Sequence, residues 1–206
     1  MIGVIGSNGL VGSHIDFADV KLDRIECPLD NFDKTLECFK KYKFDILIHC
    51  ANDTKSFPNN NTPEHFHDNT IINLNVFKAA KLSGIKKIVV LSSINAISNI
   101  GQTTYSEQDL WRGEPDENCY SDGHKNRILH ILSKMYRSDE MSCIVLMLSN
   151  TYGKNSKIGN GAIPFLIDKF MFAKKNNIDL ILDGDGSPTR DFVYVKDIVK
   201  VLKWVI

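Results

Sequence analysis

The sequence predicts an α/β fold in which a doubly wound parallel sheet is covered by helices on both faces. Apolar runs of strand length alternate with amphipathic segments of helix length along the 206 residues. The run at 45–51 is apolar almost throughout instead of alternating with polar residues, which is typical of a strand buried on both faces. The first run leads directly into a glycine-rich turn and a helical pattern. This rhythm favours a parallel sheet with crossover helices.

The individual elements follow from local patterns. We expect strands at 2–5, 20–23, 45–51, 86–93, 142–148 and 179–182, and helices at 31–43, 63–83, 121–137, 164–175 and from 195 onward. Only about two helical turns fit between Gly12 and Val20, so the first helix should be short. Pro63 suits a first helical turn, and Gly84 suits a helix end. The polar, irregular segment 94–119 is expected to be a functional loop.

Glycines at positions 6, 9 and 12 follow the first strand. A tight turn requires backbone angles that other residues disfavour, and a Cβ would separate the backbone N–H groups from a bound pyrophosphate. The helix start adds N–H groups without partners and the positive end of a dipole. The pattern therefore predicts a Rossmann-type dinucleotide site. Its residues would be Gly6, Ser7, Asn8, Gly9, Leu10, Val11 and Gly12.

Two charged residues end the second strand. Asp23 lies where an acid of a dinucleotide-binding fold would bind the adenosine ribose, and Arg24 beside it could instead meet a 2′-phosphate. The pair leaves both NAD and NADP open.

Composition excludes several classes of partner. Lys plus Arg and Asp plus Glu both number 25, so charge gives no reason to expect nucleic acid or an anionic membrane surface. The five cysteines have no paired spacing, which argues against a disulfide framework and against a zinc or other metal site. No targeting segment precedes the first strand and no apolar stretch is long enough to span a membrane. We expect a soluble cytoplasmic protein with reduced thiols.

Several stretches, in their order and spacing, resemble the extended short-chain dehydrogenase/reductase family, whose members include NAD-dependent epimerases and dehydratases. They are Gly6–Ser13, Asn69-x5-Asn75-x3-Ala79-Ala80, Leu91-Ser-Ser93, Ser149-Asn-Thr-Tyr-Gly153, Ile163–Lys169 and Asp183–Phe192. The resemblance is strongest to the branch that acts on GDP-linked 4-keto-6-deoxy sugars. It implies a dinucleotide-binding domain over 1–153 and a small, incomplete substrate lobe over 154–206, with the chain crossing between the two.

The resemblance also implies catalytic residues. In the family a Tyr, four residues before a Lys, exchanges a proton with the sugar oxygen while the nicotinamide exchanges a hydride. A nearby ammonium favours the ionised phenol. A Ser at the end of the fourth strand binds the same oxygen. The resemblance assigns these roles to Tyr120, Lys125 and Ser93. Ser92, one residue earlier on the strand, is the alternative candidate for the serine. Tyr120, Lys125, Ala51 and Leu91 are also expected at the cofactor.

The Tyr-Lys spacing departs from the family. His124 lies four residues after Tyr120, and Lys125 lies five after it. Residues five apart on a regular helix point about 140° apart, so the two side chains would not face one site. A π-bulge, or a Tyr120 placed ahead of the helix, could restore the pair. The insertion could equally mark an impaired site.

The positions that support epimerisation in the family also differ. Ile94 and Gly161 stand where a Cys and a His are expected. His14, His65 and His67 could substitute, but we expect them to be solvated surface residues.

Three further residues match family positions that bind the nucleotide sugar. They are Asn150, Lys169 and Arg190. The resemblance thus implies an NAD(P)-dependent enzyme acting on a nucleotide sugar, expected to be a reductase of a GDP-4-keto-6-deoxyhexose. Alternatives are a catalytically impaired binding module and another nucleotide-sugar epimerase or dehydratase. The resemblance further implies a homodimer formed through the helices at 63–83 and 121–137.

Overall fold

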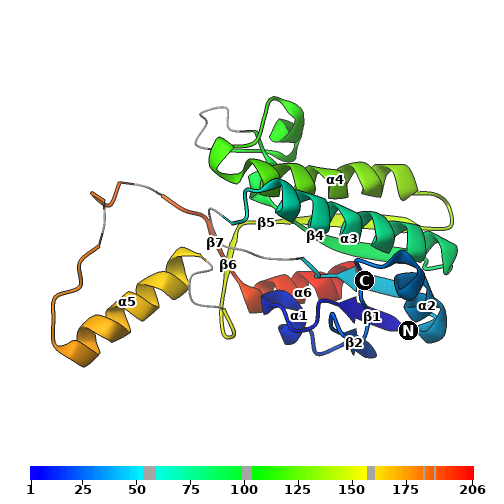
Figure 1. Cartoon of the computed structure of the whole chain (residues 1–206), viewed down its shortest axis with the longest axis horizontal. Helices are drawn as coiled ribbons and strands as arrows, with labels where there is room; N and C mark the ends of the chain where they lie inside the picture. The colour runs from blue at the N-terminus through cyan, green and yellow to red at the C-terminus, as the bar shows by residue number, and fades with distance from the viewer. Residues whose placement is uncertain (53–58, 99–103, 157–160, 183, 188) are drawn as a thin grey trace.

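The computed structural model describes residues 1–52, 59–98, 104–156, 161–182, 184–187 and 189–206 (Figure 1). Its centre is a five-stranded parallel sheet of order β2-β1-β3-β4-β5. The strands are β1 (Ile2–Ile5), β2 (Val20–Leu22), β3 (Ile46–His49), β4 (Lys87–Ser93) and β5 (Ser142–Leu148). The chain adds β2 on one side of β1 and later strands on the other, so the order reverses between β1 and β3. The predicted α/β fold is confirmed.

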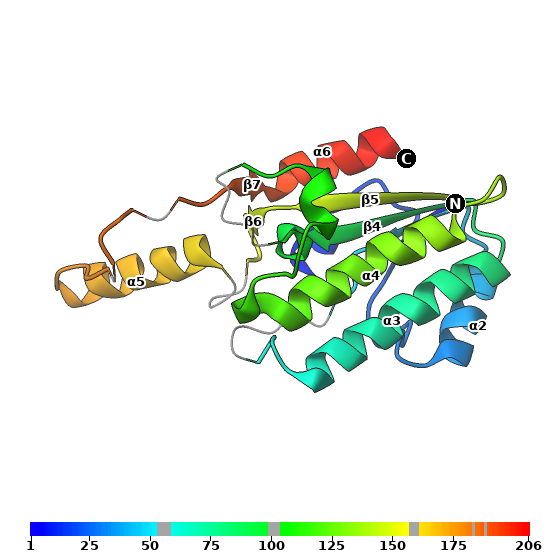
Figure 2. The same ribbon diagram turned by 90° about the horizontal axis from the view of Figure 1, so that it is seen from above.

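Helices cover both faces of the sheet (Figure 2). One face carries α2 (Phe32–Tyr42), α3 (Pro63–Leu82) and α4 (Tyr120–Tyr136), and the other carries α1 (Leu10–His14) and α6 (Val195–Val205). Phe39 and Phe77 are fully buried in the first core, and Ile15 and Leu202 in the second. Burial on both faces explains why the strands are apolar throughout.

Local sequence signals fix the helix boundaries. The Thr62 hydroxyl accepts a hydrogen bond from the backbone N–H of His65 and so begins α3, with Pro63 in its first turn. The side chain of Asn31 caps α2 in the same way. The five-residue α1 confirms the expected short first helix. The described residues of the polar segment before α4 form the 3₁₀ turns η1 (Ile94–Ala96), η2 (Glu107–Trp111) and η3 (Glu117–Cys119).

The C-terminal part differs from the sequence prediction. Two unexpected strands, β6 (Asn150–Tyr152) and β7 (Phe192–Tyr194), form a separate two-stranded parallel sheet. Between them α5 (Ala162–Asn176) extends away from the main sheet (Figure 1). The expected strand at 179–182 is wrong, because these described residues are not in a strand. Ile181 is 75% exposed, and an apolar run becomes a strand only where another strand pairs with its backbone.

The chain returns to the main sheet after β7. Val195, Ile198 and Leu202 of α6 are buried against it, next to α1. The last helix therefore belongs to the main sheet, and the predicted division at residue 153 is crossed by the chain.

The five cysteines are all free thiols, as expected. In the described ranges, no helix combines the length and hydrophobicity needed to cross a bilayer. The same residues contain no group of three or more His, Cys, Asp or Glu side chains that could hold a metal ion.

A buried histidine lies at the end of β3. The imidazole of His49 is 3% exposed, and its Nε2–H donates to Asn73 Oδ1 of α3 at 3.0 Å. Its Nδ1 has no hydrogen-bond partner among the described residues. Burial lowers the pKa of His49 to about 4, against the smaller effect of Asn73. The folded protein therefore holds this ring neutral at any pH near neutrality.

His49 should make folding sensitive to mild acid. In the unfolded chain a histidine titrates near pH 6.5, so below that pH the unfolded state binds a proton that the folded state does not. We expect the stability contributed by neutral His49 to be complete above about pH 6.5 and to fall by about 3 kcal/mol as the pH approaches 4. Urea unfolding at pH 7.5 and 4.5 should show a smaller loss for His49→Gln than for the wild type. The exposed His67→Gln is the matched control; equal losses in all three proteins would contradict the prediction.

Candidate functional site

The glycine turn packs the end of β1 against the start of α1 and the end of β3. Gly6 has φ +81°, and a Cβ there would lie 2.5 Å from the backbone nitrogen of Ala51. A Cβ on Gly12 would fall on the carbonyl oxygen of Gly6. At Gly9 a Cβ would lie 3.3 Å from the same oxygen. The close approach leaves room for a ligand against the first N–H groups of α1, which have no partner within the helix.

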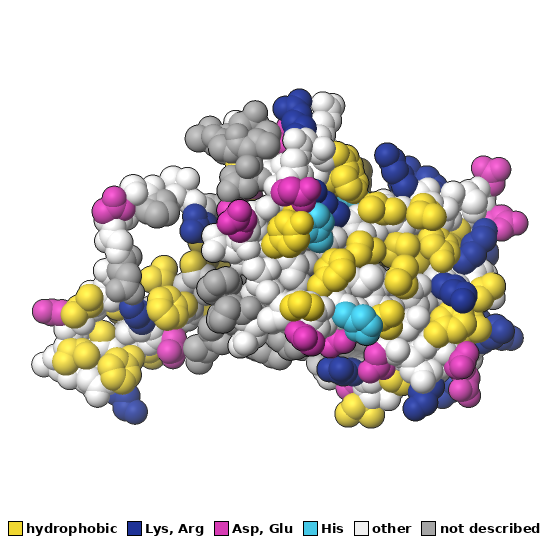
Figure 3. Space-filling model, turned by 45° about the horizontal axis from the view of Figure 1, so that its top comes forward, with side chains coloured by type: hydrophobic (Ala, Val, Ile, Leu, Met, Phe, Trp, Pro, Cys, Tyr) yellow, Lys and Arg dark blue, Asp and Glu magenta, His cyan; other side chains and the backbone are white. Residues whose placement is uncertain are grey.

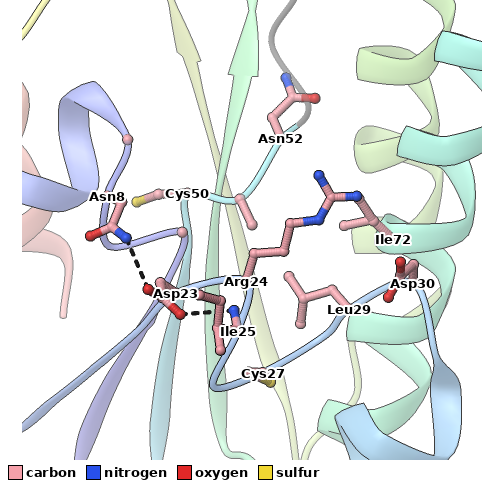
Figure 4. A pocket seen from close by; sticks show the side chains of 13 residues that line it. Asn8, Asp23, Arg24, Ile25, Cys27, Leu29, Asp30, Cys50, Asn52 and Ile72 are labelled. Carbon is pink, nitrogen blue, oxygen red and sulfur yellow. Dashed lines mark hydrogen bonds between the residues drawn. The ribbon is translucent and has the colours of Figure 1, made fainter.

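A first cavity opens beside this turn (Figure 4). Of the predicted cofactor residues, it is lined by Gly6, Asn8, Gly9, Asp23, Arg24 and Ala51. Ser7 and Gly12 are buried under the turn and support it. The structure therefore gathers these predicted residues at one place, at the carboxyl ends of β1 and β2.

Asp23 and Arg24 point in different directions (Figure 4). Asn8 Nδ2 donates to one carboxylate oxygen of Asp23 at 3.0 Å, and the backbone N–H groups of Ile25 and Glu26 donate to the other at 2.8 and 3.1 Å. The N–H groups of Glu26 and Ile25 hold the pKa of Asp23 below its ordinary value. Arg24 reaches across the cavity in Figure 4. No hydrogen bond or ion pair joins its guanidinium to another residue within the described ranges, so Arg24 can meet an anionic group.

A second cavity continues beyond the turn. It shares Asn8, Gly9, Cys50, Ala51 and Asn52 with the first cavity. It then follows the carboxyl ends of β4 and β5, where it is lined by Leu91, Ser92, Ser93, Leu148 and Ser149, and by Leu10 and Val11 of α1. The two cavities together cross the point at which the strand order reverses, where doubly wound sheets bind dinucleotides. Burial raises the pKa of Cys50 to about 12, so this lining thiol is not a thiolate.

The two serines at the end of β4 have different surroundings. Ser92 lies on the strand face that also carries Val90, toward α4, and its Oγ shares a 3.0 Å hydrogen bond with Nε2 of His130. Ser93 Oγ accepts the backbone N–H of Asn95 at 3.2 Å and begins η1. Burial lowers the pKa of His130, which favours its neutral ring. Both serines line the cavity, but the hydroxyl that faces α4 is that of Ser92 and not that of Ser93, the residue that the sequence favoured.

Lys125 is buried at the inner side of α4. Its side chain is 2% exposed, and its ammonium lies 2.6 Å from Asn52 Oδ1 and 2.9 Å from Asp122 Oδ1. The other Asp122 oxygen accepts from Asn95 Nδ2 at 2.8 Å and from Asn126 Nδ2 at 3.4 Å. Lys125 therefore ties α4 to the chain that leaves β3.

Tyr120 is placed differently. It is 47% exposed, and its ring packs edge-on against His124 with centroids 4.3 Å apart. The helix begins at Tyr120 and is α-helical to Tyr136, so neither a π-bulge nor a place ahead of the helix brings it to Lys125. Tyr120 is not among the described residues that line either cavity. The proton-exchanging role of Tyr120 stays a prediction that this geometry does not support.

The histidines considered for epimerisation lie apart from both cavities, as far as the described lining shows. The expectation of a surface His65 is wrong: it is 1% exposed, and its Nδ1 lies 3.5 Å from Ser121 Oγ. His67 is exposed as expected, and His14 is half-buried with Nδ1 2.8 Å from the Leu10 carbonyl oxygen.

The predicted sugar-binding residues lie in the C-terminal part. Asn150 of β6 donates to the carbonyl of Asp191, next to β7. Lys169 of α5 lies over the ring of Phe165, and Arg190 is exposed before β7. None of the three is among the described residues lining the two cavities, so their contact with a sugar stays a prediction.

Three residues that line the second cavity were not predicted as site residues from the sequence. They are Asn52, Asp122 and Asn126. Asn52 directly follows the third strand, so its place at the sheet edge could have been predicted. Asp122 and Asn126 are four apart on a helix and therefore share a face, but only the rotation of α4 shows that this face meets the cavity.

Comparison with known proteins agrees with this geometry. Residues 2–206 match the model of the NAD dependent epimerase/dehydratase family. The chain belongs to this family. Among its relatives, the GDP-L-fucose synthase of Dictyostelium discoideum is 29% identical over 98% of this chain and 68% of its own length.

Several solved structures share the fold of this chain. A GDP-L-fucose synthetase from Naegleria fowleri bound to NADP superposes with a TM-score of 0.88 at 24% identity, covering 99% of this chain and 72% of that one. A GDP-mannoheptose C4 reductase from Campylobacter jejuni with NADP bound has a TM-score of 0.90 at 23% identity, covering 99% and 71%. At 24% and 23% sequence identity, the similarity to these two structures establishes the fold of this chain and not its substrate.

Proposed function

We propose that this chain is an NAD(P)-dependent reductase of a 4-keto nucleotide sugar, with a GDP-4-keto-6-deoxyhexose as its substrate. The observation that carries the proposal is the continuous crevice from the glycine turn to the Ser92 hydroxyl, across the reversal of strand order. Family membership and the names of the similar proteins support the substrate class.

The first cavity suits the adenosine half of the cofactor. A side chain at Gly12 would fill the turn, so the residues present fit a pyrophosphate. Asp23 is engaged by Asn8 and its own turn, whereas Arg24 can pair with a 2′-phosphate. This arrangement favours NADP over NAD.

The second cavity suits the nicotinamide half and the sugar. The bound cofactor supplies the hydride for C4 of the sugar. Ser92 would give its proton to the C4 oxygen as the hydride is transferred, and its own oxygen would regain a proton from water. The neutral His130, whose Nε2 lies 3.0 Å from Ser92 Oγ, would orient that hydroxyl by a hydrogen bond. Epimerisation would need an acid and a base on opposite faces of the sugar. Ile94 and Gly161 supply neither, so we propose reduction without epimerisation.

A catalytically impaired dinucleotide-binding module is the second candidate. It is favoured by one specific observation, the outward position of Tyr120. Tight cofactor binding without turnover would support it over the reductase.

Dinucleotide binding is tested by a matched pair of glycine variants. Gly9 has φ −74° and its Cβ meets only one close atom, so Gly9→Val should fold and yet block the cofactor, raising Kd at least about tenfold. Gly12→Val should lose the fold as well, because its side chain meets the Gly6 backbone. Calorimetric titration with NADPH and NADH, alongside thermal melting, separates the two effects. We expect NADPH to bind more tightly; a wild type that binds neither dinucleotide would contradict the proposed function.

Turnover is tested with the two serines of β4. Ser92→Ala should lower kcat about 100-fold or more, because it removes the hydroxyl that faces α4. Ser93→Ala should keep most activity and lose about 1 kcal/mol of stability with its cap. The assay follows NADPH oxidation with a GDP-4-keto-6-deoxyhexose in deuterated water. Deuterium at C3 or C5 of the product would show epimerisation, and a greater loss in Ser93→Ala would reverse the assignment.

We also propose that the protein forms a homodimer through α3 and α4. Hydrophobic side chains gather on the face formed by these helices (Figure 3). The exposed large hydrophobic side chains of the two helices are Leu74 and Leu82 on α3 and, besides Tyr120, Ile131 and Met135 on α4. Paired with a second copy, this face would bury them in a helical interface.

Light scattering at micromolar concentration should give a dimer mass for the wild type and a monomer mass for a double variant with Ile131→Glu and Met135→Glu. Trp204→Glu, on the exposed side of α6, is the control and should stay dimeric. A monomeric wild type would remove the proposed dimer.

A further inference from the structure

The charge of the second cavity comes from Asp122. Among the described residues that line this cavity, Asp122 is the one with a charged side chain. Its side chain is 16% exposed, whereas that of Lys125, 2.9 Å away, is 2% exposed and does not contribute to the described lining. The ion pair is therefore oriented, with its carboxylate toward the cavity and its ammonium behind it.

The carboxylate is held in this position from three sides. Lys125 contacts one oxygen, and the side-chain amides of Asn95 and Asn126 donate to the other. Asn52 Oδ1, 2.6 Å from the ammonium, fixes Lys125 in turn. Three side chains from η1 and α4 thus orient Asp122, and Asn52, which follows β3, holds one of them.

The two redox forms of a nicotinamide differ in charge. The oxidised ring is a cation, and the dihydronicotinamide ring is neutral. A fixed carboxylate beside the ring stabilises the cation, and Lys125 behind it offsets only part of this attraction because it is farther from the cavity.

We propose that Asp122 makes the nicotinamide half of the crevice select the oxidised dinucleotide, NAD(P)⁺, over the reduced form. The inference rests on the proposed function in one respect, namely that the cofactor crosses from the first cavity into the second. It does not require turnover.

Binding measurements test the inference directly. Calorimetry should show NADP⁺ binding to the wild type more tightly than NADPH. In Asp122→Asn, which keeps the shape and loses the charge, the ratio of the two affinities should shift by about tenfold toward NADPH. Asp122→Glu should keep the preference for NADP⁺. Glu117→Gln, which removes an exposed carboxylate just before the same helix and outside the described lining of both cavities, is the matched control and should leave the ratio unchanged.

A fragment separates this effect from damage to the first cavity. Adenosine 2′,5′-bisphosphate lacks the nicotinamide half, so its Kd should be the same in the wild type and Asp122→Asn. Equal wild-type affinity for NADP⁺ and NADPH, or a preference for NADPH, overturns the inference even if Asp122→Asn fails to fold. An unchanged ratio in a folded Asp122→Asn overturns it as well. Absence of any dinucleotide binding to the wild type instead removes the proposed function, and the inference with it.

Discussion

The buried ammonium of Lys125 is the constraint on which the rest of the site depends. A charge that is 2% exposed must be paired, and Asp122 and Asn52 supply the partners. Removing one partner of such a pair typically costs about 3–5 kcal/mol, because the other charge stays buried. The contact therefore fixes the rotation of α4 relative to β3. Asp122 and Asn126 consequently face the cavity, and Tyr120 faces solvent.

A second buried cation holds the polar segment before α4. Arg127 Nε donates to the carbonyl of Ala96 at 2.8 Å, and an Nη donates to Gly113 at 2.7 Å and to Ser98 Oγ at 3.0 Å. These acceptors are neutral, and burial lowers the pKa of Arg127. One side of α4 thus orients the wall of the cavity, while Arg127 anchors the segment that carries η1. Both depend on a single helix.

The glycine turn and α4 act at opposite ends of one crevice. The turn lets β1, β3 and α1 approach so closely that a side chain at Gly12 would collide with the backbone. Asn52 lies between the two ends, lining both cavities and binding Lys125. The α4 end of the crevice is therefore connected through Asn52 to the chain that leaves β3, the strand that ends in the buried His49. The C-terminal part has no comparable buried polar network among its described residues.

The sequence by itself determined the parallel α/β sheet, the glycine turn and the short first helix, because periodicity, apolar runs and the steric needs of glycine are local properties. For a regular helix it also indicated that Tyr120 and Lys125 point apart, but it left a π-bulge or a Tyr120 ahead of the helix open, and the regular α4 decided between these. Only the tertiary structure decided that Asp122 and Asn126 of α4 line the cavity while Tyr120 and Lys125 are not among the described lining residues, which of Ser92 and Ser93 faces α4, and whether residues 179–182 form a strand. Each of these depends on a partner distant in sequence: Asn52 for the helix, His130 for the serine, and for the strand a neighbour that the fold does not provide.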